Sequence, residues 1–131
     1  MNEEKKQEIL MKATLLEKES ESLKENISLI EGELKNFINL ESNIQMFERD
    51  SRDTEVLTNI GKGMYVKAKL EENEIYVNVG SGIIVKKKHS ETKEIISKQV
   101  KKLNEIKIQL MTKLELYEQA MGRLIQEVRE A

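Results

Sequence analysis

The sequence contains no cysteine, no proline and no tryptophan, and only 4% of its 131 residues are aromatic. Without cysteine there can be neither a disulfide framework nor a thiolate metal site. The sequence also lacks the run of about 18 apolar residues that a membrane-spanning helix needs. Residues 1–6 carry charges, but no apolar stretch of the signal-peptide type follows them. These absences exclude disulfide-stapled and membrane-spanning proteins, and we expect a cytoplasmic protein.

What the chain has in excess is charge of both signs. Charged residues make up 35% of the chain, with 22 Lys and Arg against 24 Asp and Glu, whereas an ordinary globular domain has about 25%. The formal net charge is -2 and the pI is about 5.7, so no general affinity for nucleic acid is expected. High charge, few aromatics and no proline together favour long helices with little conventional core.

A long helix is predicted from about residue 3 to residue 47, because apolar residues recur there every seven positions. One series consists of Ile9, Leu16, Leu23, Ile30, Phe37 and Ile44, and the series four positions later consists of Ala13, Ser20, Ile27, Leu34 and Glu41. Such a 4-3 repeat, sustained over several heptads, is typical of a coiled coil. Ser20 and Glu41 interrupt the repeat. Near its end the apolar stripe drifts to Leu40, Ile44 and Phe47, which indicates a change of packing partner.

A second long helix is predicted from about residue 91 to residue 130, with Ser90 as its N-cap. Its seam consists of Ile96, Leu103, Leu110, Tyr117 and Leu124, together with Val100, Lys107, Leu114, Met121 and Val128. Lys107 is the one charged residue in this seam. It could set the register of the helix pair, or its stem could pack while its ammonium group reaches water.

The segment between the helices has the pattern of β-structure. Four short runs with alternating or β-branched residues are separated by polar or glycine-rich turns. The runs are Glu55–Ile60, Met64–Leu70, Ile75–Val79 and Ile83–Lys87, and the turns are residues 61–63, 71–74 and 80–82. This pattern predicts two successive β-hairpins.

The predicted fold is therefore α+β: a long antiparallel two-helix coiled coil with two central β-hairpins. We expect a single domain over residues 1–131, with helices at 1–48 and 90–130 and the hairpins at 55–88. The hairpins are too small to be stable alone and leave strand edges unpaired, so we expect them to assemble with other subunits into a β-barrel hub. The residues expected in this assembly are Val56, Ile60, Gly61, Gly63, Val66, Ala68, Val77, Val79, Gly80, Gly82 and Ile84.

The hairpin segment resembles that of prefoldin alpha-class subunits. Residues 59–69 contain Gly-x-Gly followed by an alternating strand with Val-x-Ala, and residues 77–85 contain Val-Gly-x-Gly followed by three aliphatic residues. Residues 94–100 are similar to the start of the family's second helix. Beta-class subunits carry a single hairpin, so two hairpins select the alpha class.

The resemblance implies an ATP-independent holdase that is not an enzyme and needs no metal or cofactor. In this family two alpha and four beta subunits form a hexamer, whose coiled-coil tips bind unfolded polypeptides and pass them to a group II chaperonin. No nucleic-acid or membrane partner is implied. An alternative from a different class is a structural protein whose hairpins polymerise into a filament or scaffold.

If the helices are antiparallel, the client-binding tip combines the start of the first helix with the end of the second. Apolar residues there exceed what the seam needs, and flexible Met and Leu side chains suit unrelated apolar partners. The predicted client-binding residues are Leu10, Met11, Leu15, Met121, Leu124, Ile125 and Val128. The alternative is that the extra apolar residues only strengthen a fraying helix end.

Three other features carry weaker signals. Residues 86–89, Lys-Lys-Lys-His, could bind an acidic partner, although a charged strand end that blocks edge pairing is the favoured interpretation. His89 has no catalytic or metal-binding constellation near it in the sequence. Residues 61–63, Gly-Lys-Gly, lack the spacing of a phosphate-binding loop and open a strand instead of a helix.

Overall fold

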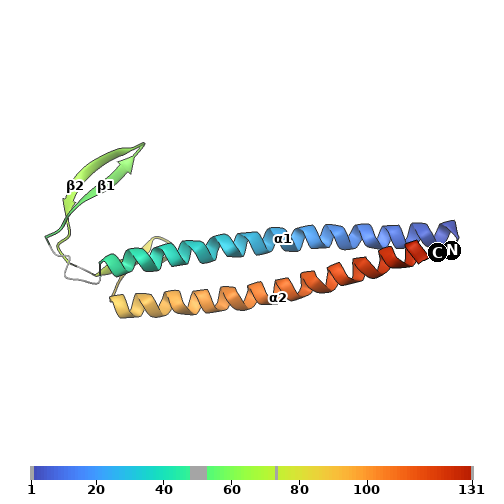
Figure 1. Cartoon of the computed structure of the whole chain (residues 1–131). Coiled ribbons are helices and arrows are strands. Elements are labelled where there is room, and N and C mark those ends of the chain that lie inside the picture. The colour runs from blue at the N-terminus through green and yellow to red at the C-terminus, as the bar shows by residue number, and fades with distance from the viewer. Residues whose placement is uncertain (1, 48–52, 73, 131) are drawn as a thin grey trace. The chain divides into compact units, whose positions relative to one another are not determined.

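A computed structural model describes residues 2–47, 53–72 and 74–130. The elements follow in the order α1 (Glu3–Met46), β1 (Glu55–Gly61), β2 (Met64–Lys69), β3 (Ile75–Gly80), β4 (Ile83–Lys87) and α2 (His89–Glu130) (Figure 1). The chain divides into two compact units. The arm unit comprises Met1–Lys35 and Val100–Ala131, and the hairpin unit comprises Asn36–Gln99. Among the described residues, no helix has the length and apolar content needed to cross a membrane.

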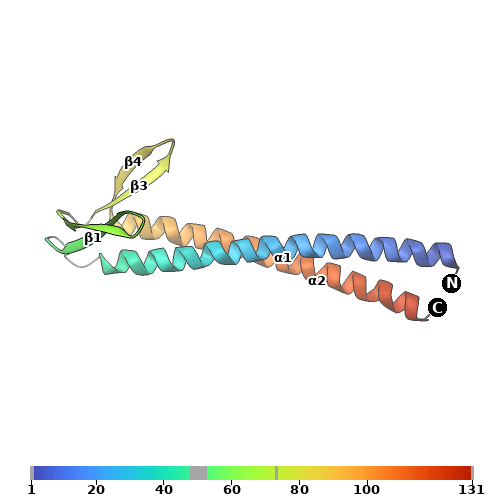
Figure 2. The same cartoon turned by 90° about the horizontal axis from the view of Figure 1, so that it is seen from above.

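In the arm unit, α1 and α2 lie side by side and run in opposite directions (Figures 1 and 2). Two contacts define the register. Lys107 Nζ lies 3.5 Å from Glu31 Oε1, and the hydroxyl of Tyr117 donates to Glu19 Oε2 over 3.3 Å. Moving toward the end of α2 therefore means moving toward the start of α1. The predicted antiparallel two-helix fold is confirmed.

The predicted seam of α1 is the face that the structure buries. Ile9, Leu23, Ile27 and Ile44 are buried, and every other predicted seam position of α1 is at least partly buried except Glu41, which is exposed. Ser20, an interruption of the apolar repeat, is the most buried of the residues that the structure describes, at 2% exposure. The seam thus tolerates a small polar residue where the apolar pattern predicts a large one.

The helix starts differ in how they are capped. Asn2 caps α1, because its Oδ1 accepts a hydrogen bond from the backbone N–H of Lys5 at 2.8 Å. For α2 the prediction of Ser90 as N-cap is wrong: the helix already includes His89, and the N–H of Thr92 donates to the carbonyl of Lys88 at 3.0 Å. Ser90 therefore lies in the first turn.

The hairpin unit contains two separate two-stranded antiparallel sheets, β1–β2 and β3–β4 (Figure 2). In the first turn Lys62 and Gly63 both have positive φ, 49° and 77°, and in the second turn Ser81 and Gly82 have 52° and 76°. Two consecutive positive φ values define the type I′ turn, whose twist matches that of a hairpin. The first turn is braced by Asn59, whose Oδ1 accepts from the N–H of Gly61 at 2.8 Å.

The two hairpins repeat each other at the level of sequence and geometry. Asn78 accepts from Gly80 N–H at 2.9 Å, as Asn59 does from Gly61, and both first strands shift register between the Asn and the Gly. Residues 55–69 match residues 74–88 at a constant offset. The identical pairs are Glu55/Glu74, Asn59/Asn78, Gly61/Gly80, Gly63/Gly82, Val66/Val85, Lys67/Lys86 and Lys69/Lys88. This internal repeat was not predicted, although its identical residues all lie at one spacing in the sequence.

Candidate functional site

A shallow apolar hollow lies on the first turns of α1, in the arm unit. It is lined by Leu10, Met11 and Leu15 together with Gln7 and Thr14. The three apolar side chains are strongly exposed, and the Thr14 hydroxyl donates to the carbonyl of Leu10 at 2.8 Å within the helix. We call this surface the tip hollow. It brings together three of the residues predicted to bind clients.

A second hollow connects α1 with α2 at the same end of the arm unit. Its apolar floor is formed by Leu15, Leu16, Ala120 and Leu124, and its charged rim by Lys12, Arg123 and Glu127. Because Leu15 lines both hollows, the apolar surface continues from α1 across to α2. We call this second surface the cross-helix hollow.

The remaining predicted tip residues lie outside the linings of these two hollows. Ile125 is exposed on α2, whereas Met121 and Val128 are partly buried in the seam, as is Leu124. The tip therefore has two classes of apolar residue: seam residues that hold the helices together, and exposed residues that are available to a partner.

The predicted assembly residues form largely exposed sheets in the hairpin unit. Ile60, Val66, Val79 and Ile84 are exposed, while Val56, Ala68 and Val77 are partly buried. Among the described residues, each strand has one strand neighbour, so its other edge is open to pairing with a further strand. Exposed apolar side chains beside free strand edges are the features of a surface that associates with another chain.

An apolar groove of about 600 Å³ lies within the hairpin unit. It is formed by the end of α1, by Leu70, Glu72 and Glu74 ahead of β3, and by the starts of β3 and α2. Its main apolar lining residues are Phe37, Leu40, Ile44, Phe47, Leu70, Ile75, Val77, Ile95 and Ile96. The drift of the α1 stripe to Leu40, Ile44 and Phe47 thus has a structural counterpart, because these residues face the groove. No comparable change in the apolar pattern indicates that β3 and α2 contribute to the groove.

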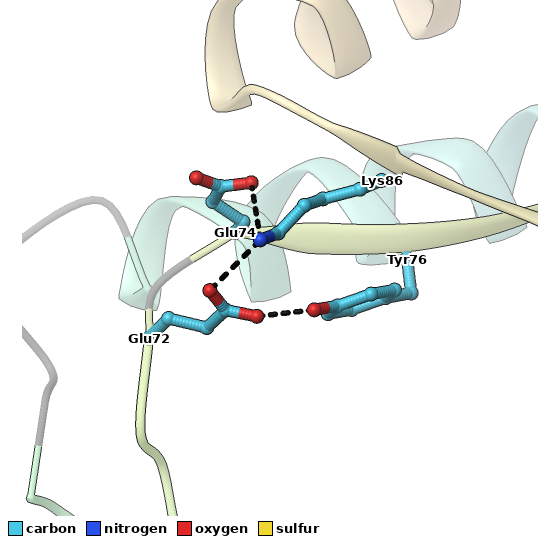
Figure 3. A network of polar contacts seen from close by, with 4 residues as sticks. All are labelled: Glu72, Glu74, Tyr76 and Lys86. Atoms are coloured by element: carbon cyan, nitrogen blue, oxygen red, sulfur yellow. Dashed lines mark hydrogen bonds and ion pairs between the residues drawn. The ribbon is translucent and has the colours of Figure 1, made fainter.

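A network of polar contacts lies beside this groove and was not predicted (Figure 3). Lys86 on β4 lies 3.0 Å from Glu72 Oε2 and 3.5 Å from Glu74 Oε2, and the hydroxyl of Tyr76 donates to Glu72 Oε1. The Lys86 ammonium group also lies 5.9 Å from the centroid of the Tyr76 ring. The network attaches the segment before β3 to the strand that follows the turn.

The network changes the acid–base properties of its members. Hydrogen bonds from Tyr76 and Lys86 lower the pKa of Glu72 below its usual 4.5. The hydrogen bond to Glu72 raises the pKa of Tyr76 above 10.0 and that of Lys86 above 10.5. For all three groups the hydrogen bond within the network is the largest cause of the pKa shift, and for Tyr76 desolvation raises the pKa further.

The lysines singled out in the sequence have partners within the chain. Lys86 forms ion pairs with Glu72 and Glu74, and Lys87 Nζ lies 3.9 Å from Glu91 Oε2. These contacts weaken the interpretation of residues 86–89 as a patch for an acidic partner. Lys107 reaches Glu31 on the facing helix, which is the contact that a register-setting residue needs. In the part of the chain that the structure describes, no three His, Cys, Asp or Glu side chains are grouped closely enough to hold a metal ion.

Comparison with known proteins agrees with this architecture. Residues 16–131 match the family model described as prefoldin subunit. No curated protein matches the sequence. Among solved structures, the cryo-EM structure of filamentous PFD from Methanocaldococcus jannaschii superposes with a TM-score of 0.74 at 19% sequence identity, covering 92% of this chain and 98% of that chain.

Proposed function

The chain belongs to the prefoldin family, a family of non-enzymatic chaperones, and from this membership we propose that it is an alpha-class subunit of an ATP-independent holdase. In this proposal the protein works in the cytoplasm, binds non-native polypeptides at the end of the arm unit and delivers them to a group II chaperonin. The two hairpins in one chain support the alpha class, because beta-class subunits carry one.

The observation that carries the proposal is the exposed apolar tip. Leu10, Met11 and Leu15 are exposed on α1, and Leu15 continues the surface into the cross-helix hollow with Leu124. A helix pair needs only its seam to associate, so these side chains are not required for packing. Unbranched and γ-branched side chains can repack against unrelated apolar segments, which suits a chaperone that binds many clients.

The hairpin unit supplies the surface for assembly in this proposal. The free strand edges, the exposed apolar residues of both hairpins and the adjacent groove would be covered by the hairpins of neighbouring subunits. We propose beta-class subunits as these neighbours, four of them with two copies of this chain. Closing the strands into a barrel removes every free edge.

The test is suppression of aggregation of a denatured client by the full chain, co-expressed with candidate beta-class subunits. A variant with Leu10→Ser, Met11→Ser and Leu15→Ser should need about tenfold more protein for the same suppression, because it loses apolar contact area. The matched control carries Ser at three exposed apolar residues elsewhere in the arm unit: Leu29, Ile108 and Met111. Equal suppression by both variants would overturn the proposed tip site.

A second candidate function is a structural filament or scaffold. Two observations bear on it: the fold is similar to that of filamentous PFD from Methanocaldococcus jannaschii, and the two hairpins repeat each other. Native mass separates the two functions. A closed hexamer with beta-class subunits supports the chaperone, whereas open-ended growth of this chain alone supports the filament.

A further inference from the structure

Methionine supplies all the sulfur chemistry of this chain, because cysteine is absent. Four methionines in the described part of the chain are well exposed: Met11 at 70%, Met46 at 73%, Met64 at 64% and Met111 at 50%. Met121, by contrast, is partly buried in the seam of α2. An oxidant that enters the solution therefore meets exposed thioethers first.

Met11 has a particular place among them, because it lies in the tip hollow. Leu10 precedes it on the helix, and Leu15 follows one turn later, so the thioether is part of a shared apolar surface. The Thr14 hydroxyl is already engaged with the carbonyl of Leu10. The apolar character of the hollow thus depends on Leu10, Met11 and Leu15.

We propose that Met11 is a reversible oxidation site through which peroxide weakens client binding. This inference rests on the proposed function of the tip. The Met11 sulfur attacks one oxygen of hydrogen peroxide, the O–O bond breaks, and an S–O bond forms. The transferred oxygen loses its proton, which the leaving hydroxide takes up to become water, so the thioether is oxidised by two electrons to a sulfoxide and the peroxide is reduced by two electrons. Methionine sulfoxide reductases reverse the reaction with electrons from a thiol.

The position of Met11 decides what oxidation does. Because its side chain is strongly exposed, a sulfoxide there stays hydrated in the free protein and leaves the helix pair intact. Binding an apolar client would remove water from the polar S–O group without replacing its hydrogen bonds, which is unfavourable. Oxidation of the partly buried Met121 would instead act on the seam.

The experiment treats the full chain, in the oligomer that it forms, with hydrogen peroxide, and measures sulfoxide at each methionine by peptide mass mapping. Aggregation suppression is measured before treatment, after treatment, and after incubation with the reductases and a thiol. Three variants are compared with the wild type: Met11→Leu keeps an apolar side chain that cannot be oxidised, Met11→Gln mimics a polar one, and Met46→Leu is the exposed control in the hairpin unit.

We expect peroxide to raise the protein concentration needed for half-maximal suppression about fivefold in the wild type and in Met46→Leu. For Met11→Leu, aggregation suppression after treatment should equal the suppression by the same variant before treatment. Met11→Gln should suppress aggregation weakly even without peroxide, and the reductases should restore suppression by the treated wild type. Unchanged suppression after Met11 is oxidised, or failure of peroxide to oxidise Met11, would overturn the inference. If the untreated wild type suppresses no aggregation, the proposed function fails instead.

Discussion

The hydroxyl of Tyr117 on α2 donates a hydrogen bond to the carboxylate of Glu19 on α1, at 3.3 Å. Ser20, the next residue on α1, is 2% exposed, and within the described structure its hydroxyl has no hydrogen-bond partner. This contact places Tyr117 at the level of Glu19 and Ser20 along the helix pair. The seam position next to this contact is thus occupied by a small, buried polar residue.

Replacing Ser20 with Ala should stabilise the arm. A buried hydroxyl without a partner costs about 1–3 kcal/mol, and its removal leaves almost the same volume. We expect the free energy of unfolding in urea to rise by about 1 kcal/mol. Ser22→Ala is the matched control, because Ser22 lies on the same helix but is exposed. A gain no larger than that of the control would show that the Ser20 hydroxyl is satisfied in solution.

Reversing the charge of Lys107 should weaken the helix pair. Lys107→Glu would bring a second carboxylate toward Glu31, in place of the ion pair at 3.5 Å. Because Glu31 is about half exposed, solvent screens the interaction, and we expect a loss of about 0.5–1 kcal/mol. The double variant Lys107→Glu, Glu31→Lys should recover part of the loss. No coupling in the double-mutant cycle would mean that the pair does not contribute to the register.

The same substitution should have opposite effects at two glycines. A β-carbon at Gly32 or Gly63 would meet no atom within 4 Å, so the backbone conformation alone determines how Ala changes the stability. Gly32 lies inside α1, where Ala is favoured by about 1 kcal/mol. Gly63 has φ of 77°, where Ala is strained by about 1 kcal/mol or more. Urea unfolding should show that Gly32→Ala stabilises the chain. Amide exchange across β1 and β2 should show that Gly63→Ala destabilises the first hairpin. Gly63→Asn should be milder than Gly63→Ala, since Asn tolerates positive φ.

The network on the second hairpin should be stable only between acid and strongly alkaline pH. The pKa of Glu72 is lowered below 4.5 in the folded chain, so its contribution is present above 4.5 and is lost as pH falls through the lowered value. The pKa of Tyr76 is raised above 10.0, so its contribution is present below 10.0 and is lost as pH rises through the raised value. The protection of β3 and β4 amides, measured as their exchange rate relative to the intrinsic rate at the same pH, should fall at both limits.

Absorbance of the tyrosine phenolate tests the alkaline limit directly. The signal that Tyr76→Phe removes from the wild-type titration should have its midpoint above 10.0, and Glu72→Gln should move that midpoint down. Tyr65→Phe is the control, because it removes an exposed tyrosine of the other hairpin. A Tyr76 midpoint at or below 10.0 would contradict the hydrogen bond to Glu72.

Much of the arm was predictable because a seven-residue repeat selects one face of a helix whatever the helix packs against. Ile9, Leu23 and Ile27 are buried as their spacing predicted. The start of α2 was misplaced, because the bond from Thr92 N–H to the Lys88 carbonyl extends the helix beyond Ser90. A side-chain preference for capping does not reveal which carbonyl the backbone will use.

The candidate surfaces were predictable only in part. Leu10, Met11 and Leu15 could be found because they exceed the needs of a coiled-coil seam. Lys86 was interpreted as part of a charged strand end that blocks edge pairing, because its partners Glu72 and Glu74 come close only once β3 and β4 pair. The sequence indicated the groove only at the end of α1, through the drift of the apolar stripe, since the other walls come from separate segments of the chain.

The sequence by itself determined the type of each element, the two hairpin turns and the apolar face of each helix, because these follow from short periodicities and from the freedom of glycine at positive φ. Only the tertiary structure decided which residues from distant segments meet. The burial of Ser20, the pairing of Lys107 with Glu31 and the groove beside Tyr76 all depend on the packed register of separate elements. Register is a property of the contact between two surfaces, so neither surface alone contains it.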